Sequence, residues 1–141
     1  MIIIYVVSFV EIQQTSIVMT TNEIAHKLAQ FCKEGKYSEA YNLYAEDAVS
    51  VEMDGWVGGQ QITKGKTAIL EGFNQWQNNI QEMHGGTVGD PVIAGNHFVL
   101  PMTSDVTFKH GERVQMDELC VYEVANGKIK KAQFFYELPP Q

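Results

Sequence analysis

The chain has 141 residues, which is enough for one domain with a sizeable buried core. It carries 10 lysines and arginines against 17 aspartates and glutamates, and this net charge of −7 argues against a nucleic-acid partner and an anionic membrane surface, since both need basic side chains. Cys32 and Cys120 fall on apolar faces of a predicted helix and a predicted strand. That placement favours buried free thiols in a reducing compartment, and therefore a cytoplasmic location, over a disulfide.

The first ten residues, MIIIYVVSFV, are apolar but too few to span a bilayer. They lack a positively charged start, and no small-residue cleavage pattern follows them, so a weak signal peptide is the least favoured of three interpretations. The others are an extra edge strand and an extension upstream of a true start at Met19, which stands just before a helix-start signal. We therefore divide the chain into an N-terminal extension, residues 1–18, and a domain, residues 19–141.

Helices are predicted in the first half of the chain. Thr20 and Glu23 form a capping box, apolar residues then recur at helical spacing, and Gly35 supplies the stop. A short second helix and a longer third helix follow. The expected helical ranges are residues 20–34, 38–45 and 65–80.

Strands dominate the second half. Asn126-Gly127 between two alternating runs is a strong hairpin signal. The expected strands are residues 49–53, 83–88, a short one near Val92, 96–108, and the two runs that flank Asn126-Gly127. Helices followed by antiparallel strands indicate an α+β fold, in which three helices cover one face of a strongly curved, mainly antiparallel sheet and leave a cone with an interior pocket.

The strand before Asn126 carries an acid on an otherwise apolar face. Glu118 falls in the middle of the alternating set Val114, Met116, Cys120, Tyr122 and Val124. A carboxylate among apolar neighbours is costly unless it is hydrogen-bonded, paired, protonated or wetted by a cavity. A β-bulge in this strand would instead turn Asp117 inward.

Three segments resemble the SnoaL-like branch of the superfamily that contains nuclear transport factor two, ketosteroid isomerase and polyketide cyclases. They are FCKEGKYSEAYNLYAEDAVSVEM from Phe31, GKTAI from Gly65, and MDELCVYEVANGKIKKAQFFYE from Met116. The resemblance covers residues 22–137 and implies a cystatin-like cone and a homodimer formed through the outer face of the sheet. It is fairly specific for the fold and weak for activity, because the superfamily hosts enzymes, binding modules and transport adaptors.

The resemblance also suggests site residues. The general-base aspartate of the isomerases falls on Glu52, and their oxyanion-hole tyrosine falls on Leu28, so that hydrogen-bond donor is absent. The second acid falls on Glu118 by strand parity or on Asp117 by local similarity, and parity favours Glu118. Similar proteins often carry a histidine facing the cone at the position of His84, where an imidazole near carboxylates can relay a proton.

Aromatic side chains are expected to line or cap the pocket. Tyr122 and Tyr136 are the better candidates, because a buried hydroxyl finds a partner in a nearby carboxylate. Trp56, in a glycine-rich loop, is expected to fold back over apolar surface, and plain core is the alternative for Trp76. The predicted substrate-binding residues are Tyr44, Trp56, Trp76, Tyr122 and Tyr136.

Two functions remain open from sequence. One is a cofactor-independent isomerase, cyclase or dehydratase acting on an apolar small molecule, with Glu52 as base, Glu118 as acid or hydrogen-bond donor, and His84 as relay. The other is a dimeric ligand-binding or accessory module without chemistry. Neither needs a metal, and the sequence has no HxxxH, CxxC, phosphate-loop or dinucleotide motif.

Overall fold

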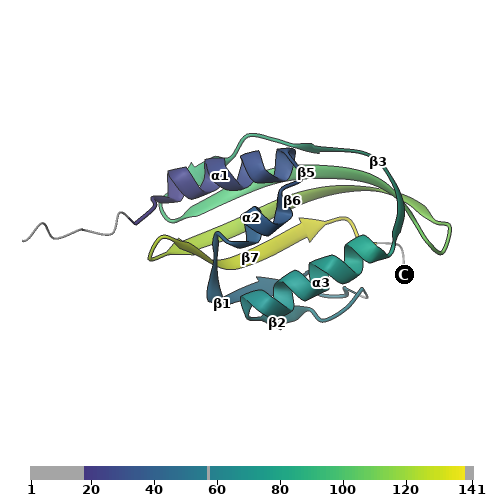
Figure 1. The fold of residues 1–141 in the computed structure, drawn as a ribbon, viewed down its shortest axis with the longest axis horizontal. Coiled ribbons are helices and arrows are strands. Elements are labelled where there is room, and N and C mark those ends of the chain that lie inside the picture. Colours follow the sequence, from purple (N-terminus) through teal and green to yellow (C-terminus); the bar gives the residue numbers. More distant parts are fainter. Residues whose placement is uncertain (1–17, 57, 139–141) are drawn as a thin grey trace, which may run out of the picture.

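Three helices lie on the concave side of a curved, seven-stranded sheet in the computed structural model, which describes residues 18–56 and 58–138 (Figure 1). The elements in chain order are α1 (Thr21–Lys33), α2 (Tyr37–Tyr41), β1 (Tyr44–Val51), β2 (Ile62–Lys64), α3 (Lys66–Asn78), β3 (Ile80–Val88), β4 (Val92–Ala94), β5 (His97–Phe108), β6 (Arg113–Ala125) and β7 (Lys128–Tyr136). The predicted α+β class is confirmed. The N-terminal extension lies outside the described residues except for Val18, so its three interpretations stay predictions.

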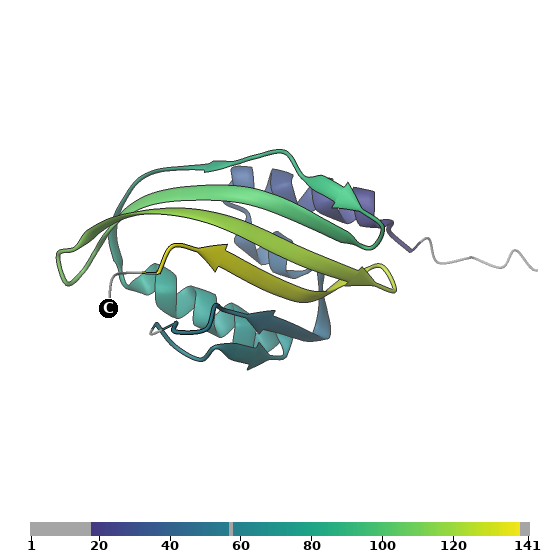
Figure 2. The same ribbon diagram turned by 180° about the vertical axis from the view of Figure 1, so that it is seen from behind.

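The sheet is mixed but mainly antiparallel. Its strand order is β2-β1-β7-β6-β5-β3, and β4 pairs with β5 away from this path. Only β1 and β7 pair in parallel among the described strands. Seen from behind, the outer face of the sheet carries no described helix (Figure 2). One face of the sheet is therefore covered and the other is left open.

Helix α1 begins and ends as its sequence predicts. The backbone N–H of Glu23 donates to the Thr20 hydroxyl at 3.2 Å, which satisfies one free donor of the first turn. At the other end Gly35 adopts a left-handed φ of 69°, and the N–H of Lys36 donates to the Phe31 carbonyl at 2.8 Å.

Two helix boundaries differ from the prediction. Helix α2 ends at Tyr41, and Tyr44 and Ala45 belong to β1 instead. The reason is tertiary: Tyr44 is aligned with Ile129 of β7, and the strand starts where that partner is available. Helix α3 ends at Asn78, because Ile80 already pairs across the sheet as the first residue of β3.

The hairpin at Asn126-Gly127 is confirmed. Both residues have positive φ, 52° and 73°, and Ala125 faces Lys128 across a two-residue turn. Gly127 has a second reason to be glycine, because a Cβ there would lie 2.4 Å from the Val18 side chain.

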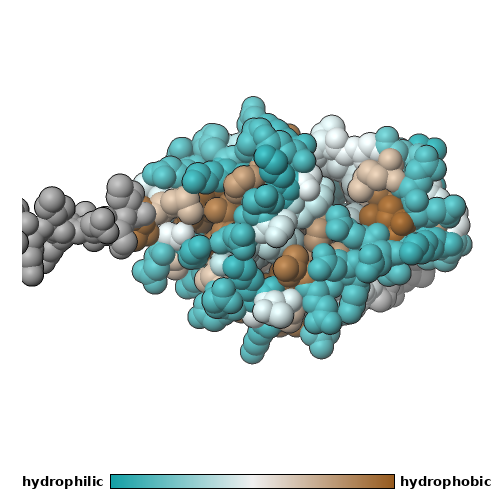
Figure 3. Space-filling model, viewed as in Figure 1, coloured by the Kyte–Doolittle hydropathy of each residue, from teal (hydrophilic) through white to brown (hydrophobic). Residues whose placement is uncertain are grey.

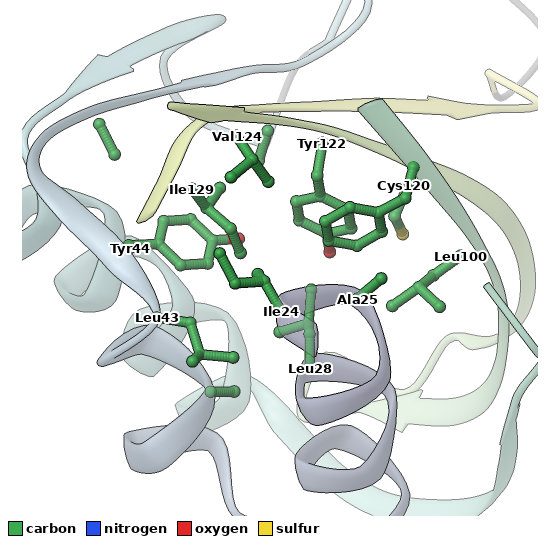
Figure 4. Close-up of a cluster of buried hydrophobic side chains, with 14 of the residues drawn as sticks. Ile24, Ala25, Leu28, Leu43, Tyr44, Leu100, Cys120, Tyr122, Val124 and Ile129 are labelled. Atoms are coloured by element: carbon green, nitrogen blue, oxygen red, sulfur yellow. The ribbon is translucent and has the colours of Figure 1, made fainter. Parts of the chain in front are cut away.

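The core lies between α1 and the middle of the sheet. Ile24 and Leu28 of α1 pack on Leu100, Cys120 and other buried side chains of β5, β6 and β7 (Figure 4). Phe98 stacks on Tyr122 with ring centroids 4.8 Å apart, which adds dispersion contact to the burial.

The helices bury one half of the concave face more completely than the other half. On β6 the inward residues Cys120, Tyr122 and Val124 are buried, whereas Val114, Met116 and Glu118 are only partly buried. The same change occurs along β7, where Ile129 and Ala132 are buried while Phe134 and Tyr136 are partly exposed. One half of the concave face is thus a closed core, and the other half remains partly accessible to solvent.

Candidate functional site

A hydrogen bond between distant segments defines the partly open half of the concave face. Tyr136, at the end of β7, donates its hydroxyl to Glu52 Oε2 at 2.8 Å. Glu52 directly follows β1, and its backbone N–H donates to the Gln61 carbonyl at 2.7 Å, which ties the position to the start of β2. Glu52 is therefore fixed by one hydrogen bond at its backbone and by a second at its carboxylate.

Glu118 is the second acid of the site. It lies on β6 directly opposite Tyr136 of β7 and Met102 of β5, on the same face as Cys120 and Tyr122. Asp117 is exposed on the opposite face, so of the two alternatives Glu118 is the inward acid. Glu118 makes no side-chain hydrogen bond within residues 18–56 and 58–138.

The two carboxylates have different environments. Burial, with a smaller contribution from the negative charge of Glu52, raises the pKa of Glu118 to about 7. Burial also raises the pKa of Glu52, but the hydrogen bond from Tyr136 opposes that shift by stabilising the charged form. At neutral pH the pair can therefore hold one proton, which resides on Glu118.

Several aromatic rings contact one another on the concave side of the sheet, and Trp56 reaches the acid site by contacting Tyr136. The Trp56 ring meets Tyr136 edge-on at 5.6 Å, so the predicted fold-back of Trp56 is confirmed. Trp76 of α3 stacks on Phe73 at 6.1 Å and meets Phe108 edge-on at 6.5 Å. We call the following partly or largely buried residues the aromatic wall: Tyr41, Trp56, Phe73, Trp76, Phe108, Phe134 and Tyr136. Figure 3 shows brown apolar side chains exposed in several separate places on this otherwise largely hydrophilic face.

Tyr44 and Tyr122 do not lie in the open half. They are 5% and 3% exposed, and their rings meet edge-on at 6.4 Å inside the core beneath α1 (Figure 4). Burial raises the pKa of both hydroxyls. The structure thus makes them packing residues, contrary to the substrate contacts expected from sequence.

His84 does not face the cone, so that expectation is wrong. Its Nε2 atom lies 2.7 Å from the Thr107 hydroxyl, and its Nδ1 atom lies 3.7 Å from Glu82. Thr107 directly follows the buried Val106 in β5, so its side chain points to the opposite, outer face of the sheet. An irregularity in the pairing between Met83 and Gly85 turns the His84 side chain to that outer face.

Tyr41 connects the buried core with the aromatic wall, although sequence reasoning did not single it out. Its ring lies 5.1 Å from Tyr44 and 5.3 Å from Phe73, and burial raises the pKa of its hydroxyl, with a smaller contribution from nearby Glu52. The four-residue spacing of Tyr37 and Tyr41 on one short helix was the available signal.

The two cysteines are free, as predicted. Burial raises the pKa of Cys32 to about 11 and also raises the pKa of Cys120. Both thiols are therefore protonated at neutral pH, which makes them weak nucleophiles and weak metal ligands. In the described part of the chain no group of three His, Cys, Asp or Glu side chains is placed to hold a metal ion.

A separate recess lies away from the acids. It has a volume of about 400 Å³ and opens where β1 and β7 lose their register. The residues that line it are Ala45, Asp47, Val49, Ala125, Asn126, Lys128 and Lys130. Neither Glu52 nor Glu118 borders it, so this recess is no part of the candidate site.

Comparisons with known proteins agree with this fold. A proposed SnoaL-like polyketide cyclase from Mesorhizobium loti is 40% identical, with a TM-score of 0.77 over 84% of this chain and 100% of that chain. A proposed isomerase from Bacillus subtilis is 19% identical, with a TM-score of 0.62 over 84% and 90% of the two chains. A protein of ketosteroid isomerase-like fold from Catenulispora acidiphila, solved with trimethylamine, is 18% identical, with a TM-score of 0.64 over 84% and 88%.

Sequence comparison identifies the family directly. No protein with curated annotation matches the chain. The sequence pattern of the SnoaL-like domain, in contrast, matches residues 19–136, which is most of the chain. Together with the curved sheet and its three helices, this match shows that the chain belongs to the SnoaL-like domain family.

Proposed function

We propose that this SnoaL-like protein is a cofactor-independent enzyme that moves protons on an apolar small molecule, as an isomerase, cyclase or dehydratase. The observation that carries the proposal is the unequal pair of inward carboxylates, one hydrogen-bonded by Tyr136 and the other without a donor among the described residues. Glu52 acts as general base, and Glu118 acts as acid or hydrogen-bond donor. Acids kept partly neutral near pH 7 are typical of sites prepared for proton transfer.

The aromatic wall supports an apolar substrate. None of its seven members carries a charge at neutral pH, and several rings remain partly exposed. Two proteins of the same fold were crystallised with small organic molecules, trimethylamine and polyporic acid, which supports a small-molecule ligand at the level of the fold. The proposed polyketide cyclase from Mesorhizobium loti points to a carbonyl-bearing substrate class.

A substrate panel tests the proposal. Turnover of carbonyl and epoxide compounds, without added cofactor, is measured for the wild type and for the double variant Glu52→Gln/Glu118→Gln. We expect turnover only in the wild type, because the amides accept no proton. Asp117→Asn is the control, since it removes an acid next to Glu118 that faces outward. Equal rates in the wild type and the double variant contradict the proposal.

One observation favours a non-catalytic ligand-binding or accessory module instead. Leu28, 2% exposed in the core, occupies the α1 position where the related isomerases have their hydrogen-bonding tyrosine. In that case the panel yields ligands that bind equally well to the wild type and the double variant, with no product from either. Calorimetric titration with the best-binding compound therefore separates the two functions.

We also propose a homodimer formed through the outer face of the sheet. Pro101, Leu119 and Phe135 lie in one row across β5, β6 and β7, and the last two are 52% and 41% exposed. Glu123 and Lys131 form a nearby cross-strand pair of opposite charge. An apolar centre flanked by both charge signs is suited to pairing with a second copy of itself.

Charging this row should break the dimer. Leu119→Arg is expected to weaken self-association by at least about tenfold, because it places a cation at the buried centre of the interface. Sedimentation velocity across a concentration series measures the effect. Ile62→Arg on β2 is the matched control, since Ile62 is equally exposed at the far end of the strand order. A wild type that is monomeric at every concentration rules the interface out.

A cytoplasmic location is a further part of the proposal. Two free cysteines are typical of a reducing compartment. None of the helices in the described part of the chain is both long and apolar enough to cross a membrane. Fluorescence microscopy of the tagged full-length chain checks the location.

A further inference from the structure

Tyr136 lies between the two acids of the site. Its strand, β7, has β1 on one side and β6 on the other. Glu52 follows the end of β1, and Glu118 stands directly opposite Tyr136 on β6. A phenol has one proton to donate, and here it goes to Glu52 Oε2 at 2.8 Å. The hydroxyl therefore distinguishes between two carboxylates that flank it.

The direction of that hydrogen bond is built into the fold. The backbone N–H of Tyr136 donates to Met53 Sδ at 3.2 Å, and the Trp56 ring packs edge-on against the Tyr136 ring at 5.6 Å. Met53 and Trp56 belong to the same short segment as Glu52. This segment contacts both the backbone and the ring of Tyr136, and these contacts hold its hydroxyl on Glu52.

We infer that Tyr136 is a positioning residue that increases the difference between the two glutamates, by directing negative charge onto Glu52 and leaving the shared proton on Glu118. Two neighbouring carboxylates titrate as a coupled pair, and a donor fixed on one of them decides which loses its proton first. The sequence predicted a substrate contact for Tyr136, whereas its bonded hydroxyl gives it this other role. A catalytic use of this difference between Glu52 and Glu118 rests on the proposed function. The difference itself can be measured whether or not the protein is an enzyme.

Carbon-13 NMR of the labelled glutamate carboxyl groups tests the inference without any substrate. In the wild type we expect two separate steps, the lower one at Glu52 and the upper one at Glu118. In Tyr136→Phe the Glu52 midpoint should rise by about one pH unit, because a hydrogen bond to a charged group is lost. The two steps should then lie closer together, because the donor that favoured negative charge on Glu52 is gone while the burial of Glu118 is unchanged.

Tyr37→Phe is the matched control, because Tyr37 is a partly buried tyrosine on α2 whose hydroxyl bonds neither acid. It should leave both midpoints unchanged. A Tyr136→Phe protein that keeps its amide spectrum and an unchanged Glu52 midpoint overturns the inference.

A second measurement needs no variant and covers the case in which Tyr136→Phe does not fold. The Cζ carbon of labelled Tyr136 in the wild type should follow the lower of the two pH steps, since its hydroxyl is bonded to Glu52. A Tyr136 signal that follows only the upper step overturns the inference. Absence of turnover in the substrate panel would contradict the proposed function, but it would not change the result of these titrations or the inference about Tyr136.

Discussion

Glu118→Gln is expected to stabilise the fold at pH 8 by up to about 3 kcal/mol and to change its stability little at pH 4. The folded protein holds the Glu118 proton up to a pKa of about 7, against an ordinary value of 4.5. Between these two values the folded state binds more protons than the unfolded state, so wild-type stability falls as pH rises. Below pH 4.5 the carboxyl is neutral in both states and the effect vanishes.

Urea unfolding from pH 4 to pH 8 measures this effect. The stability of the Glu118→Gln protein should depend less on pH between 4.5 and 7 than that of the wild type, because glutamine cannot ionise. Asp117→Asn is again the control, since Asp117 is exposed and next in sequence. If both variants follow the wild-type curve, Glu118 ionises freely in water and the description of the site as a buried acid pair is incorrect.

Local pattern was enough to predict the inward acid. The alternation along β6 continues without a bulge through Glu118, so counting every second residue from Val124 arrives at the correct side chain. Asn126-Gly127 fixed the register of the hairpin, because Asn and Gly readily adopt the positive φ that this two-residue turn has at both positions. Both predictions depend on neighbours in sequence, and this is why they succeeded.

Predictions that depend on distant packing were less successful. Tyr122 is buried because α1 packs against this part of the sheet, and the sequence of β6 alone does not show where that helix packs. His84 faces outward because of a pairing irregularity in β3, whose position depends on the partner strand β5. The hydrogen bond from Tyr136 to Glu52 joins residues 84 positions apart, and it became visible only when β1 and β7 were placed side by side.

The pH dependence of catalysis should separate the roles of the two acids. Glu52→Gln is expected to lower kcat by about 10²- to 10⁴-fold at every pH, the range typical for loss of a general base. Glu118→Gln should stay much closer to the wild type near pH 6, because an amide N–H still donates the hydrogen bond that a neutral carboxyl gives. The measurement is a kcat–pH profile from pH 5 to pH 9 with the best substrate of the panel.

Above pH 7 the two variants should diverge in a way that only the acid pair explains. Wild-type kcat should fall there, because Glu118 loses its proton at about that pH and a carboxylate donates no hydrogen bond. In Glu118→Gln this alkaline fall should disappear, so that above about pH 8 the glutamine variant equals or exceeds the wild type. In Glu52→Gln the low residual rate should still fall as the pH rises, but with a midpoint below the wild-type value of about 7, because the charge that opposed ionisation of Glu118 is gone. An alkaline fall that persists unchanged in Glu118→Gln would assign that ionisation to another group and remove Glu118 from the mechanism.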